Sequence, residues 1–372
     1  MKNYLKLLSM VAVIFLTVSY QGIAQTEKQM RVTFINPAKE ETFWKMVVSV
    51  MKAAGDDLHI NLEEIAVHRD HIKVMKIAEE VIQRKNPPDY LIIANEKAVA
   101  GDIIEQANAA GVKTMLIVNG LLPEQVAESG LPRQKYPLWI GTMIPDNVSA
   151  GFAAGQILME KALSAGVKAK DGKLHVAGIA GAYATPASLD RVKGFEQAVR
   201  KFPDVSLKQV FPNSEWSKER AAEIAKGISE RYPETAAIWA ANDNMALGAM
   251  EVFESAKKIP GKDCFFSGVN WDPVGLQAVK DGKLSVSVGG HFLIGGWALV
   301  LLYDHYHGKD FNDSGVHIEQ PMSVITDKNV DAYLDKFKNQ QWEQIDFRLF
   351  SRTLNPNMTK YDFSLNTILG QQ

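Results

Sequence analysis

Short apolar runs alternate along the chain with segments in which apolar residues recur every three or four positions. The first run, residues 32–36, is rich in β-branched and aromatic side chains. In the segment after it, Phe43, Val47, Val48 and Met51 would line one face of a helix. The later runs are almost continuously apolar, as strands buried on both faces of a parallel sheet require. The pattern predicts an α/β fold of strand and helix units with right-handed crossovers.

These units form two groups, because the pattern restarts after Pro145. In the first group, strands are predicted at 32–36, 58–67, 90–93 and 114–118, with helices near 43–51, at 70–84 and before 110. In the second group, strands are predicted at 174–180, 205–211, 236–241, 265–269 and 284–288, with helices at 148–163, 188–200, 217–231 and 243–253. A helix at 292–306, a strand at 316–319 and a helix at 330–339 follow. We therefore expect two similar doubly wound lobes joined by short crossings.

The stretch 236–253 predicts a strand that turns directly into a helix, and two polar residues stand at the turn. Asp243 is expected to cap the helix by accepting the free backbone N–H groups of its first turn. Asn242 would then face outward at the carboxyl end of the strand, where open α/β sheets bind ligands. An ordinary turn with polar residues for solubility is the alternative.

Composition agrees with a globular protein of two lobes. The chain has 372 residues, of which 46% are hydrophobic, and this length favours two domains over one. Its 41 basic and 43 acidic residues leave a net charge of −2. No broad positive field would attract nucleic acid or an anionic membrane, so we expect neither as a partner.

The N-terminus predicts export. Lys2 and Lys6 precede an apolar run at residues 7–18, and small residues at 22–24 offer a cleavage site. We interpret residues 1–24 as a signal peptide, with a mature chain that starts near Gln25 and is delivered to the periplasm. A membrane anchor is the alternative, but the run is shorter than the ~20 residues a spanning helix needs. The single cysteine, Cys264, lies in an apolar run and is expected to be a buried free thiol.

Three motifs carry a family resemblance: ETFW at 41–44, RVKGF at 191–195 and NDNMALGA at 242–249. With the layout from residue 31 to 329, they resemble type I periplasmic solute-binding proteins of the ribose- and galactose-binding kind. The resemblance implies two doubly wound parallel-sheet lobes joined by a three-strand hinge, near 142–146, 289–290 and 321–325. The N-terminal lobe would comprise residues 28–144 with 290–323, and the C-terminal lobe 145–289 with 324–340. Residues 341–372 would form a C-terminal extension.

In this fold the ligand lies in the cleft where the strand ends of both lobes meet. The resemblance places nine residues on sugar-contacting positions: Glu41, Phe43, Trp44, Asn95, Asn119, Arg191, Trp216, Asn242 and Asn270. Their chemistry also suits a sugar, which offers apolar C–H faces to aromatic rings and a rim of hydroxyls to amide, carboxylate and guanidinium groups.

Several of these residues have a purely structural alternative. Phe43 fits the core stripe of its own helix, and Trp216 would serve equally to cover the lobe surface. Arg191 would also be explained as a solvated helix residue paired with Asp190 or Glu196. Asn270 would also suit the turn before Asp272 and Pro273.

Two positions depart from the ribose-binding pattern, and they leave the identity of the sugar open. The hinge position that carries a polar side chain in that family falls on Gly290, and His291 follows it. Glu41 stands where the family often has an amide.

Catalysis has little support in the sequence, which lacks the short motifs of metalloproteases, P-loop enzymes, dinucleotide-binding enzymes and hydrolases. We predict no enzyme activity, no cofactor and no metal. The histidine pairs His68/His71 and His305/His307 are interpreted as solvated surface residues instead of metal ligands. Residues 183–186 are interpreted as a plain turn, although an anion-binding loop at a helix start is the alternative.

The resemblance implies a monomeric periplasmic substrate-binding protein that closes on a small sugar and delivers it to an ABC permease in the inner membrane. The alternative is a periplasmic receptor, similar to autoinducer-2 receptors, that signals to a membrane sensor kinase or cyclase. The aromatic-rich extension would either pack over the hinge or offer a docking surface to a sensor.

Overall fold

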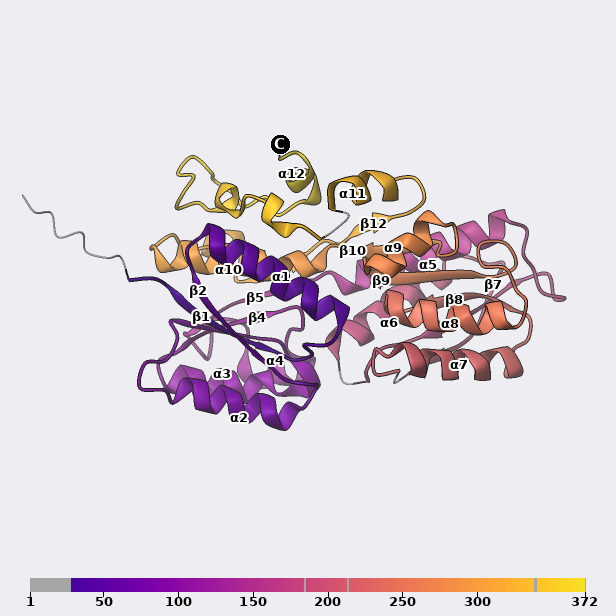
Figure 1. The fold of residues 1–372 in the computed structure, drawn as a ribbon. Helices are drawn as coiled ribbons and strands as arrows, with labels where there is room; N and C mark the ends of the chain where they lie inside the picture. The colour runs from indigo at the N-terminus through magenta and orange to yellow at the C-terminus, as the bar shows by residue number, and fades with distance from the viewer. Residues whose placement is uncertain (1–27, 184, 213, 338–339, 372) are drawn as a thin grey trace, which may run out of the picture.

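The computed structural model describes residues 28–183, 185–212, 214–337 and 340–371, so the predicted signal peptide lies outside the described residues. The chain forms two lobes side by side, each a six-stranded sheet covered by helices (Figure 1). Within the described part of the chain, every helix is too short or too polar to cross a membrane.

The sheet of the first lobe has the strand order β11-β5-β4-β3-β1-β2, and all its neighbouring strands are parallel. Its strands are β1 (Arg31–Asn36), β2 (Asn61–Ala66), β3 (Tyr90–Ile93), β4 (Lys113–Ile117), β5 (Trp139–Pro145) and β11 (His317–Gln320). Its helices are α1 (Thr42–Asp57), α2 (His71–Ile82), α3 (Ala100–Ala109), α4 (Pro123–Ser129) and α10 (Ile294–Tyr306), with 3-10 turns η1 (Glu96–Ala98), η2 (His291–Leu293) and η3 (Asn312–Ser314).

Both faces of this sheet are buried. Ile92 of β3 joins the core that contains α1 and α10, whereas its neighbours Leu91 and Ile93 join the core that contains α2 and α3. The continuous apolar runs in the sequence are explained by this two-sided burial.

The sheet of the second lobe has the order β12-β10-β9-β8-β6-β7, and only β12 is antiparallel to its neighbour among the described strands. Its strands are β6 (Leu174–Ile179), β7 (Val205–Phe211), β8 (Thr235–Ala240), β9 (Phe265–Asn270), β10 (Val286–Gly289) and β12 (Ser323–Ile325). Its helices are α5 (Asn147–Ser164), α6 (Pro186–Val199), α7 (Lys218–Arg231), α8 (Asp243–Ser255), α9 (Pro273–Lys280) and α11 (Val330–Phe337).

The chain passes between the two sheets at the three predicted places. The passages follow the last residues of β5, β10 and β11, which are Pro145, Gly289 and Gln320. Ser323 already pairs with Gly289 in the second sheet, so the third passage ends slightly before the predicted lobe boundary at 323.

Some predicted elements differ from the structure. The strand predicted at 58–67 begins only at Asn61, because Leu58 caps α1 and His59 takes a left-handed backbone conformation. Three short elements, α4, α9 and β12, were not predicted from the sequence. The predicted helix at 292–306 begins as the 3-10 turn η2 before α10.

The C-terminal segment, residues 340–371, contains η4 (Trp342–Gln344), η5 (Phe347–Phe350) and α12 (Leu365–Leu369). It covers the outer side of α10, which is why that helix is apolar nearly all round. Trp297 of α10 packs against Phe347, Phe350 and Phe363 at centroid distances of 4.6–5.4 Å. In Figure 1 the segment lies above α10 and α1 of the first lobe, beside α11.

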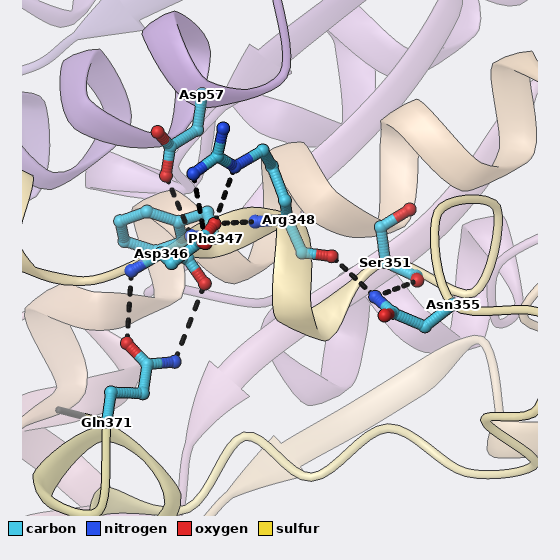
Figure 2. Close-up of polar contacts among 7 residues, drawn as sticks. All are labelled: Asp57, Asp346, Phe347, Arg348, Ser351, Asn355 and Gln371. Carbon is cyan, nitrogen blue, oxygen red and sulfur yellow. Dashed lines mark hydrogen bonds and ion pairs between the residues drawn. The ribbon is translucent and has the colours of Figure 1, made fainter.

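Polar contacts fix the same segment in place (Figure 2). The backbone N–H of Phe347 donates to Asp57 of α1 at 2.8 Å, and Arg348 pairs with Asp346. The side chain of Gln371 accepts from the backbone N–H of Asp346 at 3.0 Å, so the end of the chain is tied to the start of η5.

Candidate ligand-binding site between the lobes

A pocket lies between the lobes, at the carboxyl ends of strands from both sheets, and has an empty volume of about 370 Å³, including its part open to solvent. Eight of the nine predicted residues line it: Glu41, Phe43, Trp44, Asn119, Arg191, Trp216, Asn242 and Asn270. The other lining residues were not among the nine predicted from the sequence: Arg69, Glu96, Val118, Thr185, Ala187 and His291.

Asn95 is the predicted residue that the structure places outside this lining. It is fully buried, and its amide donates to the Gly120 carbonyl at 2.9 Å and to Gln125 at 2.7 Å. Its side-chain oxygen accepts from the backbone N–H of Ala100 at 3.0 Å. Asn95 therefore ties the start of α3 to the loops beside it, and its neighbour Glu96 reaches the pocket instead.

The wall from the N-terminal lobe is an ion-paired network around Arg69. The Arg69 guanidinium pairs bidentately with Glu41 and donates to Glu96 at 2.8 Å. Glu96 in turn accepts from the amide of Asn119 at 2.7 Å. Burial raises the pKa of Glu96, and the nearby Arg69 charge opposes this rise. The histidines beside Arg69, His68 and His71, are exposed as predicted.

Aromatic residues of α1 form the floor of the pocket. Trp44 is 2% exposed and its ring lies 5.3 Å from that of Phe43 in an edge-on arrangement. The ring of Phe43 stacks on His291 at 4.6 Å. Both residues thus belong to the core of the lobe and line the pocket, so the two interpretations of Phe43 are compatible.

Arg191 of α6 dominates the wall from the C-terminal lobe. It is 3% exposed, and it donates to Asn147 at 2.9 Å and to the Ala241 carbonyl at 2.7 Å. The alternative of a solvated arginine paired with Asp190 or Glu196 is therefore wrong. Burial lowers the pKa of Arg191 to about 10, so it stays charged at neutral pH.

His291 supplies the polar group that the resemblance places at Gly290. Its Nε2 lies 3.1 Å from Arg191 Nη2, and because arginine can only donate, Nε2 must accept and the ring proton resides on Nδ1. Burial and the Arg191 charge hold the pKa of His291 well below its usual value, so the ring is neutral. Nδ1 is buried and has no hydrogen-bond partner among the described residues.

The prediction that Asp243 caps α8 is wrong. Asn242 is the cap, and its side-chain oxygen accepts from the Met245 N–H at 2.8 Å while the residue still lines the pocket. Asp243 instead accepts from the Ser287 hydroxyl at 2.8 Å and from the Asp272 N–H at 2.9 Å. Burial raises the pKa of Asp243 to about 7 and that of Asp272 well above its usual value.

Trp216 is held in the pocket by a strained turn. Glu215 and Trp216 both have left-handed backbones, with φ of 53° and 61°. The indole lies so close to Gly181 that a Cβ there would be 2.5 Å from it. The ring also lies beside Arg191, whose guanidinium carbon is 5.6 Å from the ring centroid. Trp216 is therefore only half-buried and presents its ring to the cleft.

Two other predicted features have different outcomes. His305 is half-buried and forms a 2.7 Å hydrogen bond with the Tyr90 hydroxyl, so the solvated interpretation of that residue is wrong. Cys264 is a buried free thiol as predicted. Across the described ranges, no three His, Cys, Asp or Glu side chains are grouped as metal ligands would be.

Two α/β lobes with a polar and aromatic pocket between their strand ends are the architecture of a solute-binding protein. The chain belongs to the periplasmic binding protein domain family, whose model matches residues 32–310. The predicted family resemblance and fold are thereby confirmed.

Individual relatives agree with this assignment. A crystal structure of a periplasmic sugar-binding protein from Pseudomonas fluorescens is similar over 91% of this chain and 99% of that chain, with a TM-score of 0.82 and 34% identity. The ribose import binding protein RbsB of Bacillus subtilis is 27% identical over 266 residues, 71% of this chain and 76% of that protein. RbsB of Escherichia coli is 24% identical over 290 residues, 77% of this chain and 87% of that protein.

Proposed function

We propose that this protein is a periplasmic substrate-binding protein that closes its two lobes on a small, neutral sugar and delivers it to an ABC transporter. The observation that carries the proposal is a pair of buried polar atoms in the pocket. Asn119 Oδ1 and His291 Nδ1 both lack a hydrogen-bond partner among the described residues. Asn119 Oδ1 accepts hydrogen bonds and His291 Nδ1 donates them. A hydroxyl group can pair with either atom, because it both donates and accepts.

The rest of the lining suits the same ligand. Phe43, Trp44 and Trp216 supply flat apolar surfaces, which match the C–H faces of a sugar ring. Arg69 pairs with the carboxylates of both Glu41 and Glu96, which can also accept from ligand hydroxyls. With Arg191 included, the charged lining residues are two carboxylates and two guanidinium groups, so their formal charges sum to zero. This balance favours a neutral ligand over a sugar acid or a phosphate.

Closure follows from the division of the site between the lobes. Glu41, Arg69 and Asn119 come from one lobe and Arg191 and Asn242 from the other, so a ligand that touches both sets stabilises the closed form. The relatives, a periplasmic sugar-binding protein and ribose import binding proteins, support sugar import as the role. Export to the periplasm, the permease partner and a monomeric state belong to the same proposal.

A thermal-shift screen of the chain from Gln25 tests this function. The panel would contain D-ribose, D-allose, D-galactose and xylitol, with D-glucuronate as a charged control. At a hundredfold excess over Kd, a selective ligand stabilises the folded protein by about 2.7 kcal/mol. We expect a shift with at least one neutral sugar and none with glucuronate. A folded protein that responds to none of the neutral compounds, or to glucuronate alone, would contradict the proposal.

A matched pair of variants assigns any shift to the pocket. Asn119→Ala removes the unpartnered acceptor and, with affinity lowered at least about tenfold, should reduce the ligand-induced stabilisation to about 1.4 kcal/mol or less. Asn95→Ala removes a buried asparagine of the next strand end that does not line the pocket, and should lower the melting temperature while keeping the ligand-induced shift.

A further inference from the structure

The C-terminal segment makes a fourth connection between the lobes, in addition to the three passages between the sheets. Phe337 ends α11, which belongs to the second lobe because it follows β12 and because Asp331 pairs with Lys280 of α9 at 2.8 Å. Trp342, the first residue of η4 in the segment, packs on Phe292 of the first lobe at 4.8 Å. The rings of Phe337 and Trp342 are in contact at 5.4 Å, so the two lobes meet there.

These rings belong to one continuous aromatic row. Its members, with centroid distances of 4.8, 5.4, 5.4 and 4.8 Å between successive rings, are Trp271, Tyr333, Phe337, Trp342 and Phe292. Each end of the row is directly bonded to a residue of the pocket, since Asn270 precedes Trp271 and His291 precedes Phe292. The row therefore links the chain beside Asn270 to the chain beside His291 through continuous ring contacts.

The turn at the first end depends on the packing of its indole. Asn270 and Trp271 have φ values of 129° and 62°, which non-glycine residues adopt only when their surroundings impose them. The indole lies against the second passage, where a Cβ on Gly289 would be 2.5 Å from the ring and one on Gly290 3.2 Å. Trp271 thus fixes both Asn270 and the passage that leads to His291.

Lys336 of α11 makes a second contact across the lobes. Its ammonium group donates to the carbonyls of Ile368, Leu369 and Gln371 at 3.0, 2.7 and 2.7 Å, at the carboxyl end of α12. A cation is stabilised at this end of a helix by the unpaired carbonyls. The contact joins the second lobe to a part of the segment distant in sequence from Trp342.

The segment itself is anchored on the first lobe. The buried carboxylate of Asp304 in α10 accepts from Ser351, Arg352, Thr353 and Tyr361 at 2.6–2.9 Å. The bonds drawn in Figure 2 add a tie to α1 through Asp57. A rotation of one lobe against the other would therefore break the cross-lobe contacts of Trp342 and Lys336. The bonds to Asp304 and Asp57 would stay intact, because both residues belong to the first lobe.

We propose that the C-terminal segment is a clasp that holds the lobes closed and positions Asn270 and His291 in the ligand site. Its cross-lobe contacts exist in an arrangement in which residues of both lobes line one pocket, so they raise the population of that arrangement before any ligand binds. A protein whose binding-competent form is more populated binds its ligand more tightly in proportion. The proposal stands independently of which ligand the pocket takes.

The test is the width of the cleft in the ligand-free protein. Spin labels would be placed at Ile72 and Tyr183, whose side chains are 70% and 73% exposed on opposite lobes, while buried Cys264 escapes labelling. The distance between the two spin labels would be compared among three proteins: the doubly labelled parent, its Trp342→Ala variant and its Lys336→Ala variant. Phe363→Ala is the matched control, because it deletes an aromatic ring of the same segment that packs only on first-lobe and segment rings.

We expect Trp342→Ala and Lys336→Ala to lengthen or broaden the distance distribution, and Phe363→Ala to leave it unchanged. If a ligand of the pocket has been found, its Kd should rise at least about threefold in the first two variants only. Unchanged distances in both clasp variants, or an equal change in Phe363→Ala, would overturn the proposal. Lys336→Ala removes no core side chain, so its result stands even if Trp342→Ala does not fold. A sugar screen without a hit would count against the proposed function and leave this distance test intact.

Discussion

Replacing Gly194 by alanine should destabilise the second lobe and weaken ligand binding. Gly194 of α6 faces α5 so closely that a Cβ would lie 1.9 Å from the Val148 carbonyl oxygen and 2.7 Å from the Phe152 nitrogen. The approach is reciprocal, since a Cβ on Gly151 would lie 1.9 Å from the Arg191 carbonyl oxygen. Ordinary contact begins near 3.4 Å, so the two helices would have to separate by more than an ångström.

The magnitude follows from two opposing contributions. Overpacking of a tight core contact costs about 1–3 kcal/mol. Alanine in a helix interior recovers about 0.5–1 kcal/mol relative to glycine. We therefore expect Gly194→Ala to lower the free energy of unfolding by about 1–2 kcal/mol, measured by urea denaturation.

The same displacement reaches the ligand site, because Arg191 lies one helical turn before Gly194. Its 2.9 Å bond to Asn147 spans α6 and α5, and separation of the helices would lengthen it. Ligand affinity should therefore fall along with stability. Gly227→Ala in α7 is the control, because a Cβ there meets no atom within 4 Å. It should raise stability by about 0.5–1 kcal/mol and leave affinity unchanged. A Gly194→Ala protein as stable as wild type and with unchanged affinity would refute this reasoning.

Three further predictions concern buried charges. Arg69→Met leaves the carboxylates of Glu41 and Glu96 without their cation. It should lower the free energy of unfolding by about 2–4 kcal/mol, measured by urea titration at pH 7. An unchanged free energy of unfolding would show that the ion-paired network does not stabilise the fold. Asp304→Asn should lower the free energy of unfolding by at least about 2 kcal/mol and make the C-terminal segment sensitive to limited proteolysis. The control, Asp313→Asn at an exposed carboxylate, should change the free energy of unfolding by less than about 1 kcal/mol. The folded pKa of Asp243 is raised to about 7, against about 3.9 in an unfolded chain, so the native state binds more protons between these values. The free energy of unfolding of wild type should therefore fall relative to that of Asp243→Asn as the pH rises from 5 to 8. The same pH dependence in both proteins would contradict a raised pKa of Asp243.

The two-lobed fold was predictable because most of its strands are buried on both faces. Such strands leave continuous apolar runs in the sequence, and each is followed by a helix with a clear apolar face. The strand β12 escaped because it has three residues, and it is recognisable only by its antiparallel pairing with β10. A pairing between residues far apart in sequence leaves no local pattern.

The site was predictable to the extent that strand ends determine it. Asn119, Asn242 and Asn270 follow or end parallel strands, so their place at the cleft follows from the fold. The choice between Asn95 and Glu96 could not be made, because a 3-10 turn after β3 decides which of them faces the pocket.

Two further residues depended on distant contacts. Arg69 stands between two polar residues, His68 and Asp70, and only its pairing with two glutamates separated from it in sequence reveals its role. Asn242 and Asp243 are equally good helix caps by type. Asn242 is the cap because the Asp243 carboxylate is already bonded to the Ser287 hydroxyl and the Asp272 N–H. The role of Arg69 and the identity of the helix cap thus depend on tertiary contacts, which leave no local pattern in the sequence.

The central claim is that the buried atoms Asn119 Oδ1 and His291 Nδ1 receive the hydroxyls of a neutral sugar. The most direct test is calorimetric titration of the best sugar from the screen into wild type, Asn119→Ala, His291→Phe and Asn95→Ala. We predict 1:1 binding to wild type and Asn95→Ala, with affinity reduced at least about tenfold in the other two variants, about 1.4 kcal/mol or more each. Equal affinity in all four proteins would contradict the account.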